Sequence, residues 1–139
     1  MIILDTNVLS ALMQTQPDAQ VVSWLDRQPA ESIWLSAVTL FEARYGLALL
    51  EDGQRKQYLQ QQLNLLLHVD FENRVLPFDA DAANQAAILA AQRKARGRPV
   101  DMRDTFIAGI ALAQRAAIAT RNTRHFDDLD VAVLNPWQG

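Results

Sequence analysis

The sequence predicts an α/β fold, a three-layer α/β/α sandwich built on a mainly parallel sheet of about five strands. Short apolar runs rich in β-branched residues, typical of strands buried on both faces, alternate with longer segments of helical pattern. The length of 139 residues suits one domain that covers residues 1–139. No internal repeat, low-complexity segment or linker divides the chain.

The short apolar runs are the expected strands. The first begins almost at the N-terminus and is followed directly by an acidic residue, Asp5. The last is expected at the sheet edge and ends before Pro136. The expected strands cover residues 2–4, 32–35, 74–78, 117–120 and 131–134.

Capping residues and helix breakers mark the helices between these strands. The start signals are Thr6 or Asn7, Asp18, Ser36, Gly53, Asp79 or Asp81, and Pro99. The expected helices cover residues 6–12, 19–27, 37–50, 54–69, 79–95 and 102–115. The helix over 54–69 carries a leucine stripe. We expect this stripe and the preceding helix over 37–50 to be partly exposed in a monomer and to mark a homodimer interface. The stripe consists of Leu59, Leu63, Leu66 and Leu67.

The composition restricts the class of protein. There is no cysteine, which excludes a disulfide framework, a thiolate metal site and a thiol nucleophile. Charged residues make up 21% of the chain, which argues against disorder, and no apolar run approaches the roughly 20 residues of a bilayer span. The N-terminal segment has no basic region, so we expect neither a signal peptide nor a transit peptide. The expectation is a soluble, cytoplasmic protein with no membrane partner.

The charge is distributed unevenly. The net charge of −3, taken alone, argues against a nucleic-acid partner. Residues 93–124, however, carry eight basic and two acidic residues, a net +6, which leaves −9 for the rest of the chain. This basic stretch also contains two candidate site residues, Asp104 and Asn122. Its arginines are therefore expected to rim a site, and the net charge does not exclude a nucleic-acid partner.

Polar residues follow two of the expected strands, where ligands bind in open α/β sheets. Asp5 comes after three buried aliphatic residues, and it is equally suited to cap a helix or to serve a site. Asn122 follows the strand over 117–120. It is compatible with an ordinary turn or with a hydrogen bond to a metal-bound water.

Glu42 needs a compensating group. Glu42 and Arg44 are the only charged residues between Glu31 and Glu51, and Arg44 points to another side of the helix. An unpaired buried carboxylate is costly. We therefore expect a distant arginine or a metal ion beside Glu42; the alternative is an exposed glutamate on the flank of the helix.

Asp101 and Asp104 stand at the start of one helix, where an N-cap and a first-turn acid are both favourable. Asp104 differs from Asp101 because Ala108 and Ala111 share its face. That face is small and apolar, suited to packing on the sheet, so it directs Asp104 inward toward the strand ends. Asp101 is interpreted as a cap.

The residue types available favour hard oxygen ligands. His68 and His125 lack the spacing of zinc ligands, and the chain contains no Ser-His-Asp arrangement and no glycine-rich phosphate loop. A cluster of carboxylates remains. Such clusters favour Mg²⁺ or Mn²⁺ over softer metals.

Four segments, in this order and spacing, resemble the PIN-domain toxin family, specifically the VapC-type and FitB-type toxins of type II toxin–antitoxin pairs. The resemblance covers nearly the whole chain, and the ending Asn135-Pro136-Trp137 also resembles FitB-type chains. The four segments are Ile2-Ile3-Leu4-Asp5-Thr6-Asn7, Thr39-Leu40-Phe41-Glu42 followed by Gly46, Asp104-Thr105-Phe106-Ile107-Ala108, and Thr120-Arg121-Asn122-Thr123-Arg124-His125-Phe126.

The resemblance implies a PIN-like nuclease, an endoribonuclease that depends on Mg²⁺ or Mn²⁺. The acidic positions of the family fall on Asp5, Glu42 and Asp104, so we expect Asp5 and Asp104 to bind the metal. We expect Glu42 to bind it or to orient the attacking water. The fourth acidic position of the family falls on Asn122, a departure that argues against tight binding of a second metal ion.

The resemblance also implies supporting residues and partners. Thr6 and Thr120 match positions that support the site by hydrogen bonding. Arg103 and Arg121 flank site positions and are expected to hold RNA phosphates. The expected partners are an RNA substrate and a small cognate antitoxin, a ribbon-helix-helix or AbrB-like DNA-binding protein. A homodimer is expected, as is a heterotetramer or larger assembly with the antitoxin.

Two alternative functions remain open from the sequence. The first is a catalytically weak toxin-like partner, which binds an antitoxin arginine with its carboxylates and regulates through the DNA-bound complex. The second is a phosphohydrolase of the haloacid-dehalogenase type, because a strand there also ends in Asp. That mechanism needs a second Asp two residues later, where this chain has Asn7.

Overall fold

The computed structural model describes residues 1–139 and contains a five-stranded sheet in which every pair of neighbouring strands is parallel. The strand order is β3-β2-β1-β4-β5, so the predicted parallel sheet and the edge position of the last strand are confirmed. Strand β3 is shorter than expected because Pro77 follows it and cannot donate a ladder hydrogen bond. The strands are β1 (Ile2–Leu4), β2 (Ile33–Ser36), β3 (Val75–Leu76), β4 (Ala117–Ala119) and β5 (Val133–Leu134).

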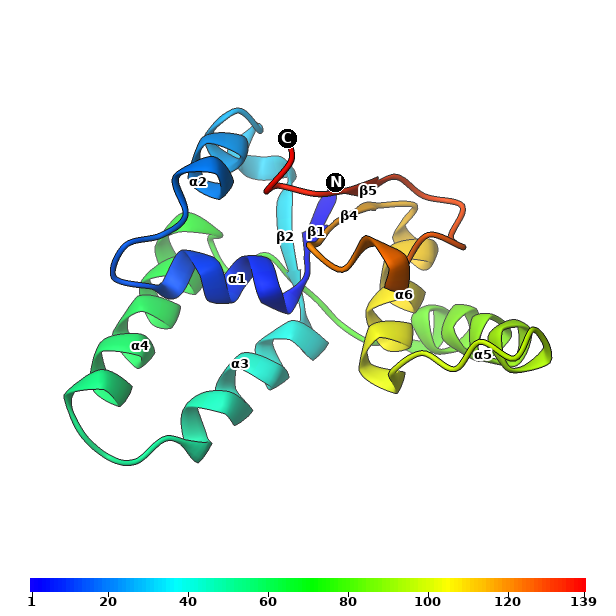
Figure 1. The fold of residues 1–139 in the computed structure, drawn as a ribbon, viewed down its shortest axis with the longest axis horizontal. Coiled ribbons are helices and arrows are strands. Elements are labelled where there is room, and N and C mark those ends of the chain that lie inside the picture. Colours follow the sequence, from blue (N-terminus) through cyan, green and yellow to red (C-terminus); the bar gives the residue numbers. More distant parts are fainter.

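Six α-helices connect the strands, and Figure 1 shows α5 and α6 on one side of the sheet with α1 and α4 on the other. Helix α4 continues into a π-helical turn, Leu66–Asp70, which completes the expected helix over 54–69. None of the helices is long and apolar enough to cross a bilayer. The helices are α1 (Thr6–Met13), α2 (Ala19–Asp26), α3 (Ala37–Leu49), α4 (Gln54–Leu65), α5 (Ala80–Ala95) and α6 (Met102–Gln114).

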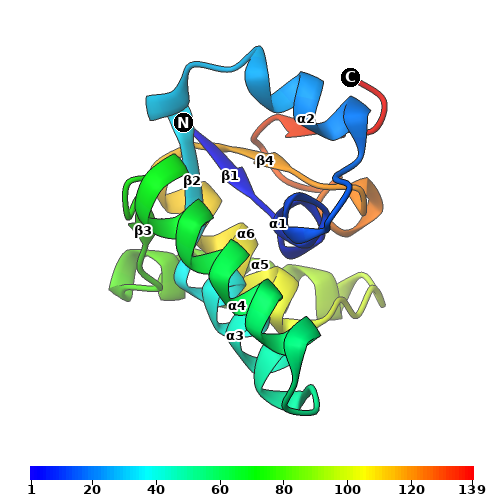
Figure 2. The same ribbon diagram turned by 90° about the vertical axis from the view of Figure 1, so that its left-hand side faces the viewer.

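The sheet separates two apolar cores, which makes the predicted three layers. Leu4 of β1 packs on one face with Val8 of α1 and Leu63 of α4. Ile3, the preceding residue, packs on the other face with Ile107 of α6. Successive strand residues point to opposite faces, so a continuous apolar strand requires a helical layer on each side. Figure 2 shows α4 in front of the sheet, and α5 and α6 behind it.

The two helices expected to be partly exposed differ: the leucine stripe is largely covered, whereas the preceding helix, α3, is partly exposed. Leu63, Leu66 and Leu67 are all buried in the core shared with α1 and the sheet, so they offer no surface to a second copy. On α3, Phe41, Tyr45 and Leu49 recur at helical spacing and are each at least half exposed, as expected for the helix over 37–50. The rings of Phe41 and Tyr45 stack with centroids 5.8 Å apart. We call Phe41, Tyr45 and Leu49 the α3 patch.

Helices α5 and α6 cross closely at Gly109. A Cβ atom at this position would lie 2.5 Å from the carbonyl oxygen of Ala82 and 2.8 Å from the Cβ of Ala86. Replacing Gly109 by Ala is therefore expected to lower the free energy of unfolding by about 1–3 kcal/mol, despite the higher helix propensity of alanine. Urea denaturation measures the change. Gly46→Ala is the control, because nothing lies within 4 Å of its added Cβ; equal stability of the two variants would contradict the close crossing.

The parallel arrangement places the carboxyl ends of β1, β2 and β4 at the same edge of the sheet. Helix α1 starts directly after β1, and Asp5 is its N-cap, in place of the expected Thr6 or Asn7. Ser36 caps α3 as predicted and accepts a hydrogen bond from the Thr39 amide. The starts of α1 and α3 and the segment after β4 therefore surround one edge.

Candidate metal centre

Asp5 lies at the centre of this edge and is only 4% exposed. Its Oδ1 accepts a hydrogen bond from the Thr6 amide at 2.8 Å, and its Oδ2 accepts one from the Thr120 hydroxyl at 2.7 Å. Burial raises the pKa of Asp5, and these two hydrogen bonds oppose the shift without cancelling it. The carboxylate is thus fixed in one orientation and costly to leave charged without a cation.

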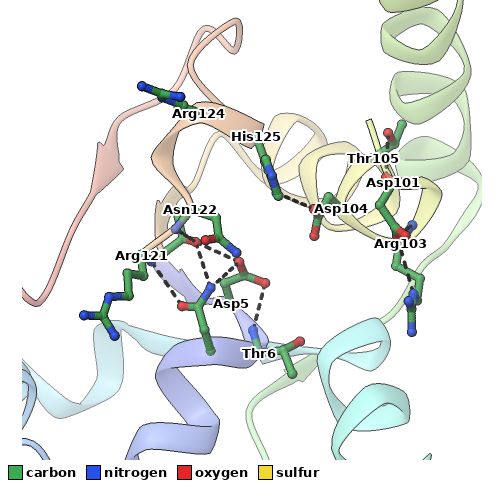
Figure 3. A network of polar contacts seen from close by, with 12 residues as sticks. Asp5, Thr6, Asp101, Arg103, Asp104, Thr105, Arg121, Asn122, Arg124 and His125 are labelled. Carbon is green, nitrogen blue, oxygen red and sulfur yellow. Dashed lines mark hydrogen bonds and ion pairs between the residues drawn. The ribbon is translucent and has the colours of Figure 1, made fainter. Parts of the chain in front are cut away.

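Asn7 joins the ends of β1 and β4, a role that our sequence prediction missed. Its amide Nδ2 donates to Asp5 Oδ2 at 3.2 Å and to Thr120 Oγ1 at 3.3 Å, and its Oδ1 accepts from the Arg121 amide. Thr120 Oγ1 also accepts from the Asn122 amide at 3.0 Å. Figure 3 shows this network around Asp5. Thr120 therefore hydrogen-bonds the Asp5 carboxylate together with Asn7.

Glu42 approaches the same edge from α3. Its Oε1 accepts a hydrogen bond from the Thr6 hydroxyl at 2.8 Å, and its Oε2 lies 3.7 Å from Nη1 of Arg103 on α6. The structure thus provides the distant arginine expected beside Glu42. Arg103 also pairs with Asp101, which caps α6 as predicted. Arg103 therefore bridges two acids, while its side chain remains half exposed.

Asp104 faces the site from the first turn of α6, as the alanine stripe predicted. Its Oδ2 lies 2.7 Å from Nδ1 of His125, a contact visible in Figure 3. A carboxylate can only accept, so the ring donates from Nδ1. Burial raises the pKa of Asp104, and the hydrogen bond from His125 partly offsets this shift. His125 is a site residue that our prediction did not include, because spacing was tested only for zinc ligation with His68.

Arg121 and Asn122 lie on the exposed segment after β4, at the edge of the candidate site. The Asn122 side chain makes no hydrogen bond to the protein, and the residue is exposed. Arg121 extends away from Asp5 in Figure 3, and its guanidinium carbon lies 4.9 Å from the ring centroid of Trp137. Both positions are open to a ligand that reaches the site.

Not all cations of the basic stretch, residues 93–124, lie at the surface. This corrects the expectation that its arginines rim a site. Arg93 is buried, and its guanidinium is paired with Asp128 at 2.9 Å. Arg98 pairs with Asp127 at 2.6 Å. The exposed cations of the stretch are Lys94, Arg96, Arg103, Arg115, Arg121 and Arg124.

The donor chemistry fits a hard divalent cation that keeps part of its water. No group of three acidic or histidine side chains is gathered closely enough to hold an ion by itself. The charge of Asp104 nevertheless raises the pKa of Asp5, and the charge of Glu42 raises the pKa of Asp104. The three carboxylates are therefore close enough to repel one another. Mg²⁺ is usually bound by one or two carboxylates and several waters. Asp5 and Asp104 suit direct ligation, and Glu42 suits contact through water.

Comparison with known proteins gives a consistent family. The family model described as "PIN domain" matches residues 2–132. The chain is 41% identical over 138 residues to "VapC ribonuclease Y4jK" of Sinorhizobium fredii, and the match covers 99% of both chains. It is 41% identical over 137 residues to "Toxin FitB" of Neisseria gonorrhoeae, again over 99% of both. The solved structure "FitAB bound to IR36 DNA fragment" superposes with a TM-score of 0.89 at 40% identity, covering 99% of this chain and 96% of the other.

Proposed function

This chain belongs to the PIN-domain family, and from that premise we propose that it is a Mg²⁺- or Mn²⁺-dependent endoribonuclease, the toxin of a type II toxin–antitoxin pair. The observation that carries the proposal is Asp5. It is a buried carboxylate with a raised pKa that faces Asp104 at the open edge of a parallel sheet. A carboxylate that only caps a helix does not need to be buried. A buried carboxylate near a second one is stabilised in its charged form by a bound cation.

Each residue of the site has a separate role in the proposed hydrolysis of an RNA phosphodiester. A bound divalent cation acidifies a water molecule and stabilises negative charge on the phosphate. Asp5 and Asp104 would hold the cation in fixed positions, because hydrogen bonds orient both carboxylates: both oxygens of Asp5 and Oδ2 of Asp104 are engaged. Glu42, oriented by Thr6, accepts a hydrogen bond from the attacking water. Arg103 and Arg121 hold flanking phosphates.

Cleavage of RNA by the purified protein tests the proposal. We expect hydrolysis of total cellular RNA with Mg²⁺ or Mn²⁺, and none with a chelator. Sequencing the RNA ends produced after induction in cells then identifies the RNA that is cut. Failure to cut any RNA with either metal would overturn the endoribonuclease assignment.

Metal binding should stabilise the protein in a pH-dependent way. The pKa values of Asp5 and Asp104 are raised in the folded state, so without metal their protonation favours folding at acidic pH, and this contribution disappears as the pH rises through those values. A cation competes with the protons. The increase in Tm caused by Mg²⁺ is therefore expected to grow from about pH 5 to about pH 8. Thermal denaturation with and without Mg²⁺ measures it; a constant or falling increase would contradict ligation by these carboxylates.

The partners follow from the toxin assignment. We propose a small DNA-binding antitoxin of the ribbon-helix-helix or AbrB-like class, a homodimer, and a heterotetramer or larger assembly with the antitoxin. The α3 patch provides apolar surface of the kind found at protein interfaces. A monomeric mass by light scattering at micromolar concentration would contradict the dimer. Because its substrate is cellular RNA, we place the protein in the cytoplasm.

A catalytically weak partner is the competing function. The relative solved as a complex with DNA is the observation that favours it. In that case the carboxylates would bind the antitoxin, and the pair would act on promoter DNA. Purified protein that binds metal and antitoxin but cuts no RNA would favour this alternative.

A further inference from the structure

Arg93, near the end of α5, is an arginine held inside the protein. It is 2% exposed, and arginine is almost never buried so completely unless it is paired. Its Nε and Nη2 donate to the two carboxylate oxygens of Asp128, each at 2.9 Å. Nη2 also donates to the His125 carbonyl at 2.7 Å, and Nη1 donates to the Thr105 hydroxyl at 3.0 Å.

These partners lie on both sides of the contact between His125 and Asp104. Thr105 directly follows Asp104 on α6, and the His125 carbonyl belongs to the residue whose ring bonds Asp104. One rigid guanidinium therefore connects the helix that carries the carboxylate to the segment that carries the ring. The Asp128 pair fixes the orientation of the guanidinium, because a bidentate pair constrains both position and plane.

The segment between Asn122 and Asp128 has little regular structure of its own. It contains one 3₁₀ turn, Thr123–His125, whose N-terminal residue makes no capping hydrogen bond through its side chain. Phe126 anchors the segment in the core, but an apolar ring does not fix the direction of the His125 side chain. Arg93 instead holds the backbone on both sides of Phe126, at the His125 carbonyl and at the Asp128 carboxylate.

We propose that Arg93 is a positioning residue of the metal centre: it holds the His125 ring on Asp104 Oδ2 and so leaves Oδ1 oriented for the cation. The metal ligation part of this inference rests on the proposed function. Hydrogen-bonding partners of metal ligands typically contribute about 10–100-fold to metal affinity. Arg93 would not contact the metal ligand Asp104 itself; it would act on Asp104 through His125.

Arg93→Lys is the informative variant, because it keeps the buried positive charge but loses the planar fork that reaches three partners. We expect Arg93→Lys and His125→Ala each to weaken Mn²⁺ binding by about 10-fold or more in titration calorimetry. We expect the double variant to bind no more weakly than the weaker single variant, because both changes remove the same contact. Arg96→Lys, an exposed arginine three residues after Arg93 that makes no ion pair, is the matched control and should bind Mn²⁺ like the wild type.

A second readout needs neither metal nor RNA. Two-dimensional ¹H–¹⁵N spectra of the histidine rings report hydrogen bonding at Nδ1, and His68, which bonds Asn73 elsewhere, serves as the internal reference. Arg93→Lys should shift the Nδ1 signal of His125 toward that of a free ring and leave His68 unchanged. If Arg93→Lys does not fold, Thr105→Val removes one partner of Arg93 and should shift the same signal by a smaller amount.

The outcomes separate this inference from the proposed function. Wild-type protein that binds no Mn²⁺ contradicts the proposed function, and the ring spectrum then decides alone whether Arg93 positions His125. Mn²⁺ affinity and a His125 signal unchanged in a folded Arg93→Lys protein would overturn the positioning role. Additive losses in the double variant would also overturn it, because Arg93 would then act independently of His125.

Discussion

Replacing Asp5 by Asn is expected to lower the rate of RNA cleavage by more than about 100-fold. The substitution removes the negative charge with which Asp5 would hold the cation. It also places an amide NH₂ group where Asp5 Oδ2 now accepts hydrogen bonds from Thr120 and Asn7. The rate is measured by single-turnover cleavage of an RNA oligonucleotide with Mg²⁺.

Asp18→Asn is the matched control for this substitution. Asp18 is also an aspartate that caps a helix, α2, and asparagine caps equally well. We expect the Asp18→Asn protein to cleave at the wild-type rate. An Asp5→Asn protein that cleaves as fast as this control would mean that Asp5 serves only as a helix cap.

Replacing Arg93 by Leu is expected to lower the free energy of unfolding by about 3–5 kcal/mol, because it removes the bidentate partner of buried Asp128 and leaves only Arg98, whose Nη1 lies 3.9 Å from Asp128 Oδ2. Arg93 lowers the pKa of Asp128 in the folded state, so the stability gained from the pair is present at neutral pH and lost as the pH falls. The difference from the wild type should therefore shrink below about pH 4. Urea denaturation at several pH values measures it.

Arg98→Leu distinguishes a buried pair from an exposed one. Arg98 pairs with Asp127 on the same segment, and solvent reaches both side chains. Its distance to Asp128 Oδ2, 3.9 Å, is longer than the 2.9 Å of Arg93. Replacing Arg98 by Leu is expected to lower the free energy of unfolding much less than replacing Arg93 by Leu. Equal losses for the two variants would contradict the special role of the buried guanidinium.

Much of the fold could be predicted from local sequence signals. Ser36, Asp18 and Asp101 cap helices as predicted, because capping depends on residues adjacent in the chain. The parallel sheet follows from apolar runs too continuous for a one-sided sheet. The leucine stripe was misassigned because periodicity shows which residues share a face, but not whether another element covers that face.

The candidate site could be predicted only where one residue carried the signal. Asp5 follows a buried strand, and the uncharged surroundings of Glu42 implied a distant partner, which is Arg103. The contacts of His125 and Arg93 join residues 21 and 35 positions apart. Those contacts depend on the path of the segment after β4, so charge counting along the chain placed Arg93 among surface cations.

The chemistry of the cleaved RNA ends tests the central claim most directly. Purified wild-type protein is incubated with an RNA oligonucleotide in Mg²⁺ or in a chelator, and the products are analysed by mass spectrometry. Attack by a metal-activated water predicts 5′-phosphate and 3′-hydroxyl ends that form only with the metal. Cleavage that persists in the chelator, or products ending in 2′,3′-cyclic phosphate, would contradict the account, because such products come from attack by the 2′-hydroxyl group of the RNA itself.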